Sequence, residues 1–354
     1  LIIFFFNYIM NRIFITGICG FLGSNLANYF QSLGNKVYGI DNLIRKGSEK
    51  NFNLLKNNGV KVFKGDLVNL KKFKLFKKNI NFQAFIHCAA LTSILDGTNN
   101  NSTEFLYKNN FISTLHSLKL CNLLKSKFIY ISSSRVYSIP EINQIKFKLK
   151  NDSFKLKKNK LDGISSKGIN ENFSIKPPLS FYGSSKLMCE NLIQEYCIFN
   201  KMPFIINRCG LLSGRGQFYK SDQGIISFWI NSWKNKKKLD YINFGGHGYQ
   251  VRDCLHPLDL ASLIKKQINF LQRKNLKKLI FNVSGGMSSS FSLRELSLWC
   301  KKNISPKKIG YRKRTRPFDL KWIVLDNTRA KKTFKWKIKF SKYKIFEDIN
   351  LNGG

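Results

Sequence analysis

Tyr182 and Lys186 lie four residues apart in the stretch FYGSSK, a spacing that could serve acid–base chemistry. Four residues is about one helical turn, so on a helix both side chains would point the same way. A phenol with a pKa near ~10 is a poor base at neutral pH, but a neighbouring ammonium favours the phenolate and lowers that pKa. The pair could therefore transfer protons at neutral pH, or it could be a chance pairing on an exposed helix.

Gly17, Gly20 and Gly23 recur at every third position in FITGICGFLGSNLA. The stretch ends a strand-like run and opens a helix-like one. In that context the first glycine permits a tight turn, the second lets the backbone approach a pyrophosphate, and the third lets the helix pack closely on the strand. The helix N-terminus then faces the phosphates, so the pattern predicts a dinucleotide site.

Two carboxylates follow strand-like runs that come next in the chain. Asp41 stands 18 residues after Gly23, where it could accept hydrogen bonds from both ribose hydroxyls and repel a 2′-phosphate. This favours NAD over NADP, although Arg45 and Lys46 keep the alternative open, and Asp41 could also be a turn residue. Asp66 is placed to meet the adenine edge or to cap the following helix.

Three serines end a further apolar run in YISSSRVYS, residues 130–138. A hydroxyl at such a strand end could hydrogen-bond a sugar hydroxyl or keto oxygen beside the Tyr182 phenol. The alternative is a strand end with capping serines.

The elements that must position these residues alternate along the first half of the chain. The expected strands cover residues 12–16, 36–41, 60–66, 84–90, 127–134 and 203–209, and the expected helices cover 20–34, 102–124 and 180–199. Repeated strand–helix–strand units with short apolar strands predict an α/β fold, a Rossmann-type doubly wound parallel sheet. Ligands of such sheets bind at the carboxyl ends of the strands.

The expected organisation is a dinucleotide-binding domain over residues 10–204 and a smaller substrate-binding lobe over 205–354, with 239–275 partly returning to the first domain. Residues 140–176 are rich in Lys, Asn and Ser without a clear period. We expect them to form a long, partly mobile surface excursion, which could clamp a substrate phosphate or simply be solvated. Residues 1–9, before Met10, are interpreted as an upstream extension.

The net charge of +41 could indicate a protein that binds polyanions. Lysine supplies 49 of the 61 basic residues, and the lysines are spread over most of the chain. No aromatic-interleaved RNA-binding signature or zinc-finger spacing accompanies them. A genome rich in A and T supplies such a composition, so we expect no nucleic-acid partner, although the charge should attract nucleotides.

Eight cysteines and four histidines show no CxxC pair and no spacing typical of metal ligands. We therefore expect reduced, buried thiols in a cytoplasmic protein, and no metal site. No run reaches about 18 apolar residues, so we expect no membrane insertion.

The segments TGICGFLG, Asp41, GDL, HCAA, SSSRVY and YGSSK occur in the order found in extended short-chain dehydrogenases/reductases. From about Met10 to Trp336, the chain resembles the sugar-nucleotide epimerase/dehydratase family. The resemblance implies NAD as cofactor and a nucleotide-diphosphate sugar as substrate. By it Tyr182 is the general base, Lys186 lowers the Tyr182 pKa and holds the ribose, and Ser133 matches the catalytic Ser or Thr.

The resemblance also implies the remaining site residues and a homodimer or higher homo-oligomer. The expected cofactor site consists of Gly17, Cys19, Gly20, Phe21, Leu22, Gly23, Asp41, Asn42, Asp66, Leu67, Ala89, Ala90, Asn110, Tyr182 and Lys186. The expected substrate site consists of Ser133, Ser134, Arg208, Gln223, Arg252 and Arg316.

Within that site Arg252 and Arg316 match arginines that bind the nucleotide diphosphate, which suits the fork of donors on a guanidinium. The family often has an Asn three residues after the position of Arg208. Here that residue is Leu211, so the contacts of this loop do not transfer, and Asp222 and Gln223 are candidate replacements.

The residues after Ser133 indicate the reaction. Dehydratases of the family carry Asp-Glu directly after the catalytic Thr, whereas Ser134 and Arg135 stand here, and neither can act as the acid that expels water. Epimerisation remains, and residues 207–230 and 241–260 resemble the branch that epimerises CDP-sugars at C2. The alternatives are another nucleotide-sugar oxidoreductase or epimerase, acting on UDP- or GDP-sugars, and a non-catalytic NAD-binding protein.

Overall fold

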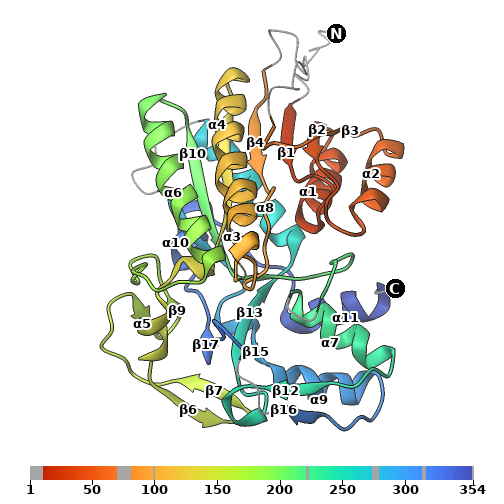
Figure 1. Ribbon diagram of the computed structural model, residues 1–354, viewed down its shortest axis with the longest axis vertical. Coiled ribbons are helices and arrows are strands. Elements are labelled where there is room, and N and C mark those ends of the chain that lie inside the picture. The colour runs from red at the N-terminus through yellow and green to blue at the C-terminus, as the bar shows by residue number, and fades with distance from the viewer. Residues whose placement is uncertain are drawn as a thin grey trace, which may run out of the picture.

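A seven-stranded parallel sheet forms the centre of the computed structural model, which describes residues 11–69, 81–98, 100–220, 223–272, 279–312 and 316–352. The strand order is β14–β10–β5–β4–β1–β2–β3. The strands are β1 (Arg12–Thr16), β2 (Lys36–Asp41), β3 (Lys61–Lys64), β4 (Ala84–His87), β5 (Lys127–Ser133), β10 (Phe204–Cys209) and β14 (Ile280–Val283). The order reverses beside β1, which confirms the predicted doubly wound α/β fold (Figure 1).

Alternating strand residues divide between two apolar cores, one on each face of this sheet. Ile13 and Ile15 of β1 belong to one core, while Phe14 between them belongs to the other. The first face is covered by α1 (Phe21–Ser32), α2 (Ser48–Asn57), α8 (Pro257–Leu271) and α10 (Thr328–Phe334). The second is covered by α4 (Ser113–Leu123) and α6 (Phe181–Phe199).

The predicted helix over residues 102–124 contains a local widening. It consists of α3 (Asn100–Tyr107), the π-helical turn η2 (Lys108–Ile112) and α4. Such π-turns inside helices are frequent at functional sites, and here the turn carries Asn110.

A second lobe lies below the carboxyl ends of the strands in Figure 1. Its strands are β11 (Leu211–Leu212), β13 (Val251–Leu255), β15 (Ser290–Ser292) and β17 (Trp322–Ile323) in one sheet, and β12 (Asp240–Ile242) and β16 (Gly310–Arg312) in another. Its helices are α7 (Ile225–Lys234), α9 (Leu293–Asn303) and α11 (Lys342–Asn352), and its short turns are η4 (Phe244–Gly246) and η5 (Met287–Ser289). Trp229 and Trp233 of α7 lie in its core.

The chain passes between the lobes several times after residue 205. It leaves the large sheet with β10, and α8, β14 and α10 then return to it. Strand β14 carries no clear alternation, and it is a strand that the sequence did not predict.

The stretch 140–176 has regular structure, in contrast to the long surface excursion that we expected. It contains most of α5 (Ile139–Asn143), the hairpin β6 (Phe147–Lys150) and β7 (Ser153–Leu156), and the hairpin β8 (Ile164–Ser165) and β9 (Gly168–Ile169). Ile169 and Phe173 are buried in a core with Trp322 of the second lobe. The apolar residues contact a distant segment at irregular intervals, so no period marks them.

None of the helices in the described part of the chain is both long and apolar enough to cross a membrane.

Candidate functional site

A cavity of about 930 Å³ lies at the carboxyl ends of the large sheet, between the two lobes. Residues from the ends of β1, β2, β4, β5 and β10 line one side, and residues of the second lobe line the other. The location is the one predicted for ligands of a doubly wound sheet.

The backbone of the glycine turn packs tightly against its neighbours, which leaves the space in front of it free for a ligand. Gly17 adopts φ +64°, and a Cβ there would lie 2.8 Å from the Cα of Ala89. A Cβ on Gly23 would lie 2.1 Å from the Gly17 carbonyl oxygen, so α1 can approach β1 only with glycine at this position. Gly20, Phe21 and Leu22 also line the cavity, and the helix N-terminus faces it. The turn therefore fits a dinucleotide phosphate.

Asp41 stands at the end of β2 as expected, in the cavity wall. Its carboxylate accepts hydrogen bonds from the backbone N–H of Cys19 at 2.9 Å and of Leu43 at 2.8 Å. Burial raises the pKa of this carboxyl, and the backbone hydrogen bonds oppose the rise. Cys19 itself is buried and does not line the cavity, so its part is to orient Asp41. Asn42 lines the cavity beside them.

Asp66 and Leu67 line the cavity after β3, and Ala89 and Ala90 line it after β4. The Asp66 carboxylate accepts a hydrogen bond of 2.9 Å from the backbone N–H of Val68. The helix that Asp66 was expected to cap would fall largely on residues 70–80, which lie outside the described part of the chain.

Ser133, Tyr182 and Lys186 meet in the same cavity. Ser133 is the last residue of β5, and Tyr182 and Lys186 lie on the first turns of α6, whose cap residue Ser180 accepts a hydrogen bond from Gly183. Burial raises the pKa of Tyr182 to about 12, while a hydrogen bond with Ser133 lowers it. The geometry thus joins the strand-end serine to the helical phenol, as the sequence predicted.

The contacts of Lys186 differ from the expected ones. Its Nζ donates a 2.9 Å hydrogen bond to the Ile131 carbonyl and lies 4.8 Å from the centroid of the Tyr130 ring. Burial lowers the pKa of this lysine. Among the charges that act on Tyr182, that of Arg135 lowers its pKa.

Asn110 lies behind the cavity wall rather than in it. Its side chain accepts a hydrogen bond of 2.8 Å from the Leu91 N–H and donates to the Leu91 carbonyl and to the Ser185 hydroxyl. It therefore ties the loop after β4 to the helix that carries Tyr182, which is a positioning role.

Of the six predicted substrate residues, Ser133, Ser134, Gln223, Arg252 and Arg316 line the cavity. Arg208 does not, because its guanidinium is 4% exposed and pairs with the Glu190 carboxylate at 2.7 Å. Its ring neighbour is Tyr137, 5.2 Å away. The structure thus places Arg208 in the internal scaffold of β10 and α6. Asp222 lies outside the described residues.

Two carboxamide oxygens in the cavity wall have no hydrogen-bond partner within the described part of the chain. They belong to Gln223 and Gln250, and both atoms are buried.

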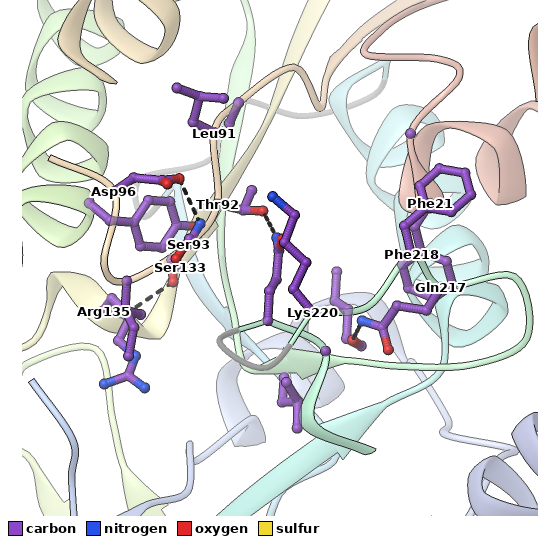
Figure 2. Close-up of a pocket in the computed structure, with 18 of the residues that line it drawn as sticks. Phe21, Leu91, Thr92, Ser93, Asp96, Ser133, Arg135, Gln217, Phe218 and Lys220 are labelled. Carbon is purple, nitrogen blue, oxygen red and sulfur yellow. Dashed lines mark hydrogen bonds between the residues drawn. The ribbon is translucent and has the colours of Figure 1, made fainter. Parts of the chain in front are cut away.

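The sequence did not reveal the loop that follows β4. Thr92, Ser93 and Asp96 line the cavity, and Figure 2 shows them above Ser133. Asp96 accepts a 3.0 Å hydrogen bond from the Ser93 N–H, and its charge opposes ionisation of Tyr182. These residues belong to no recognisable sequence motif. An ordinary polar turn brings them to the edge of the sheet.

A segment of the second lobe, residues 213–220, crosses to the cofactor side, and we call it the strap. The Arg45 guanidinium donates a 3.1 Å hydrogen bond to the Phe218 carbonyl. The Phe218 ring lies so close to Gly47 that a Cβ there would be 2.7 Å from it. Gln217 and Phe218 line the cavity near Phe21 (Figure 2). Arg45, which kept NADP open as an alternative, thus contacts the strap.

Comparisons with known proteins identify the family to which this chain is similar. The model of the NAD dependent epimerase/dehydratase family matches residues 13–284. CDP-paratose 2-epimerase of Salmonella typhi is 29% identical over 80% of this chain and 82% of its own length. The dTDP-D-glucose 4,6-dehydratase of Dictyostelium discoideum is 30% identical over 72% of this chain and 54% of its own length.

A solved structure is also similar. It is a mutant UDP-glucuronic acid 4-epimerase from Bacillus cereus, in complex with a fluorinated UDP-glucuronic acid and NAD. It superimposes with a TM-score of 0.77 at 23% identity and covers 96% of this chain and 98% of its own. At this identity the likeness shows the fold alone.

Proposed function

The chain belongs to the NAD-dependent epimerase/dehydratase family, and on that premise we propose that it epimerises a nucleotide-diphosphate sugar. The observation that carries the proposal is the meeting of Ser133, Tyr182 and Lys186 in a cavity whose other wall is the glycine turn and Asp41. This arrangement supports the proposal of a proton-transfer group at the edge of a dinucleotide site.

In the proposed mechanism Tyr182, as phenolate, takes the proton of a sugar hydroxyl, and the Ser133 hydroxyl hydrogen-bonds the same oxygen. When bound, NAD supplies a hydride acceptor that later becomes the hydride donor. Tyr182 then returns a proton to the keto oxygen after the sugar has turned over in the cavity.

The residues beside Ser133 favour epimerisation over dehydration. Ser134 and Arg135 follow it in the cavity wall, and neither is a carboxylic acid that could protonate a leaving hydroxyl. The relative at 30% identity is a dehydratase, so the distinction rests on these side chains.

We propose a CDP-sugar as substrate and C2 as the carbon inverted, in the manner named for CDP-paratose 2-epimerase. The support is the similarity to that protein over both chains' length. The solved relative with a UDP-sugar makes UDP-sugars the second class to test.

Proton NMR of the purified protein tests the proposal, with a panel of CDP-, UDP- and GDP-sugars that includes CDP-paratose and no added cofactor. We expect a new anomeric signal from one CDP-sugar with no net change in NADH, because the hydride returns to the sugar. A signal from a UDP- or GDP-sugar would assign the substrate to that class instead. Net NADH formation would indicate oxidation in place of epimerisation. If no sugar reacts although the protein holds NAD, a non-catalytic NAD-binding protein would be favoured.

A further inference from the structure

Three guanidiniums meet at one turn of the second lobe, residues 316–319. Arg316 belongs to the turn, which closes through a hydrogen bond of 3.3 Å from the Asp319 N–H to the Arg316 carbonyl. Arg252 donates to the Asp319 carboxylate at 2.8 Å. Arg135 donates to the Phe318 carbonyl at 3.0 Å. All three arginines line the cavity.

Arg135 reaches this turn from the catalytic side. Its backbone follows Ser133 by two residues and lies against the first turn of α6, since a Cβ on Gly183 would be 2.2 Å from the Arg135 carbonyl oxygen. Figure 2 shows its guanidinium extending away from Ser133. Arg135 therefore spans the distance between the proton-transfer group and the other two arginines.

The charges of this cluster favour a diphosphate. Three guanidiniums face two carboxylates of the cavity wall, those of Asp319 and of Asp253 beside Arg252, so positive charge is in excess. A diphosphate, with one negative charge on each phosphate, would offset that excess. Burial lowers the pKa of Arg135 to about 10, and the charges of Arg252 and Arg316 add to the effect. A bound anion would relieve this repulsion.

We propose that Arg135 is the third arginine of a diphosphate-binding cluster and binds the phosphate attached to the sugar. The inference rests on the proposed function, since it assumes a nucleotide-diphosphate ligand, and it names which group that ligand offers to Arg135. Arg252 and Arg316 then face the diphosphate from the second lobe, and Arg135 faces it from the turn after β5. The site is thereby built from both lobes.

The test compares nucleoside diphosphates with monophosphates, because the terminal phosphate of CDP or UDP is the one that carries the sugar. We measure the affinities of CDP, UDP, GDP, dTDP and ADP, and of the matching monophosphates, by isothermal titration calorimetry on the full chain. No turnover is needed, so a failure of epimerisation leaves this result interpretable.

In Arg135→Gln we expect the affinity of the best diphosphate to fall about 10- to 100-fold, while its monophosphate changes by less than about threefold. Arg135→Lys keeps the charge without the fork and should recover part of the loss. Arg294→Gln is the matched control, since Arg294 pairs with Asp152 on the surface and does not line the cavity. It should leave both affinities unchanged.

Four outcomes would overturn the inference. The wild-type protein could bind none of the diphosphates. Arg135→Gln could weaken mono- and diphosphates equally, which would indicate a structural role, or it could weaken neither. The variant could also keep UDP affinity but lose a wild-type preference for UDP-glucuronate over UDP-glucose, which would assign Arg135 to a carboxylate on the sugar.

Discussion

The phenol of Tyr182 is buried among groups that act on it in opposite directions. Desolvation raises its pKa to about 12, and Asp96 adds to the rise, whereas Ser133 and Arg135 lower it. At neutral pH the free protein therefore holds Tyr182 protonated, and the proposed mechanism requires that this pKa fall when cofactor and substrate bind. The sequence singled out Tyr182 and Lys186 by their spacing and Ser133 by the family resemblance, and all three line one cavity. The balance of charges around the phenol depends on residues far apart in the chain, which no spacing marks.

Tyr182→Phe tests the phenol alone. We expect turnover of the nucleotide sugar to fall at least about 1,000-fold, because the variant has no group to take or return the proton. We expect NAD to copurify with the wild type, and the variant should hold as much of it, since the ring still fills the cavity wall. The measurement is NMR turnover together with absorbance of released NAD, and near-normal turnover would remove Tyr182 from the mechanism.

Helix α6 and the turn η3 (Ser134–Val136) form the joint on which the site depends. The helix begins at Phe181, and Gly183 brings its first turn against the Arg135 carbonyl. Ser133 and Tyr182 contact each other because no side chain intervenes at this point. This contact is similar to the glycine turn on the cofactor side, because at both places a Cβ on the glycine would clash with a backbone oxygen.

Gly183→Ala should separate these two elements. The added Cβ would meet a backbone oxygen at 2.2 Å, so η3 or α6 has to shift, and both Ser133 and Tyr182 move with them. We expect a loss of about 1 to 3 kcal/mol in unfolding free energy and a fall in turnover larger than in NAD content. Ser184→Ala, in the same turn, should change neither quantity by much. Equal behaviour of the two variants in urea unfolding and NMR turnover would contradict this account.

Elements with a clear local pattern could be predicted from the sequence, whereas those without one could not. Strands β1 and β2 match their predicted spans because short apolar runs end in glycine or carboxylate punctuation. Strand β14 and the excursion 140–176 lack such periods, since their burial is set by partners from other parts of the chain. The same reason explains Arg208, whose partner Glu190 lies on another element and could not be identified by spacing.

The two lobes are joined through Asp253 of β13, which is 2% exposed. Its carboxylate accepts hydrogen bonds of 3.1 Å from the N–H groups of Gly286 and Leu325. Burial raises its pKa to about 6, and the hydrogen bonds oppose this. Because the folded protein holds the proton more tightly than the unfolded chain, this group stabilises the fold below pH ~4 and loses that contribution as the pH rises through ~6.

Asp253→Asn should remove that pH dependence. The amide oxygen can still accept both hydrogen bonds, and no charge has to be buried. Between pH 4 and pH 6 we expect the wild type to lose about 2 kcal/mol of stability relative to the variant. Urea unfolding of both proteins at the two pH values measures the difference. The surface variant Asp152→Asn is the control, and an unchanged slope in Asp253→Asn would refute the assignment.

The strap connects the second lobe to the expected cofactor side of the cavity, where Phe218 contacts Arg45 and Gly47. Phe218→Ala would open the contact with Gly47, so we expect NAD to dissociate about tenfold faster, with little change in the free energy of unfolding. The dissociation rate can be followed by fluorescence of released dinucleotide after dilution. Tyr219→Ala, at an exposed neighbouring aromatic, should retain NAD as the wild type does. Equal rates in the two variants would remove the strap from cofactor retention.

The interleaving of the lobes governs how the chain can fold during synthesis. Strand β14 pairs with β10 and α8 covers α1, yet both emerge from the ribosome well after the first six strands of the sheet. Until then β10 is an open edge, and Ile205, which belongs to the core shared with α8 and β14, lacks part of its cover; such edges recruit other chains. A nascent chain that has released β10 but not β14 from the ribosome should therefore need a chaperone, while one that has also released β14 can close its own edge.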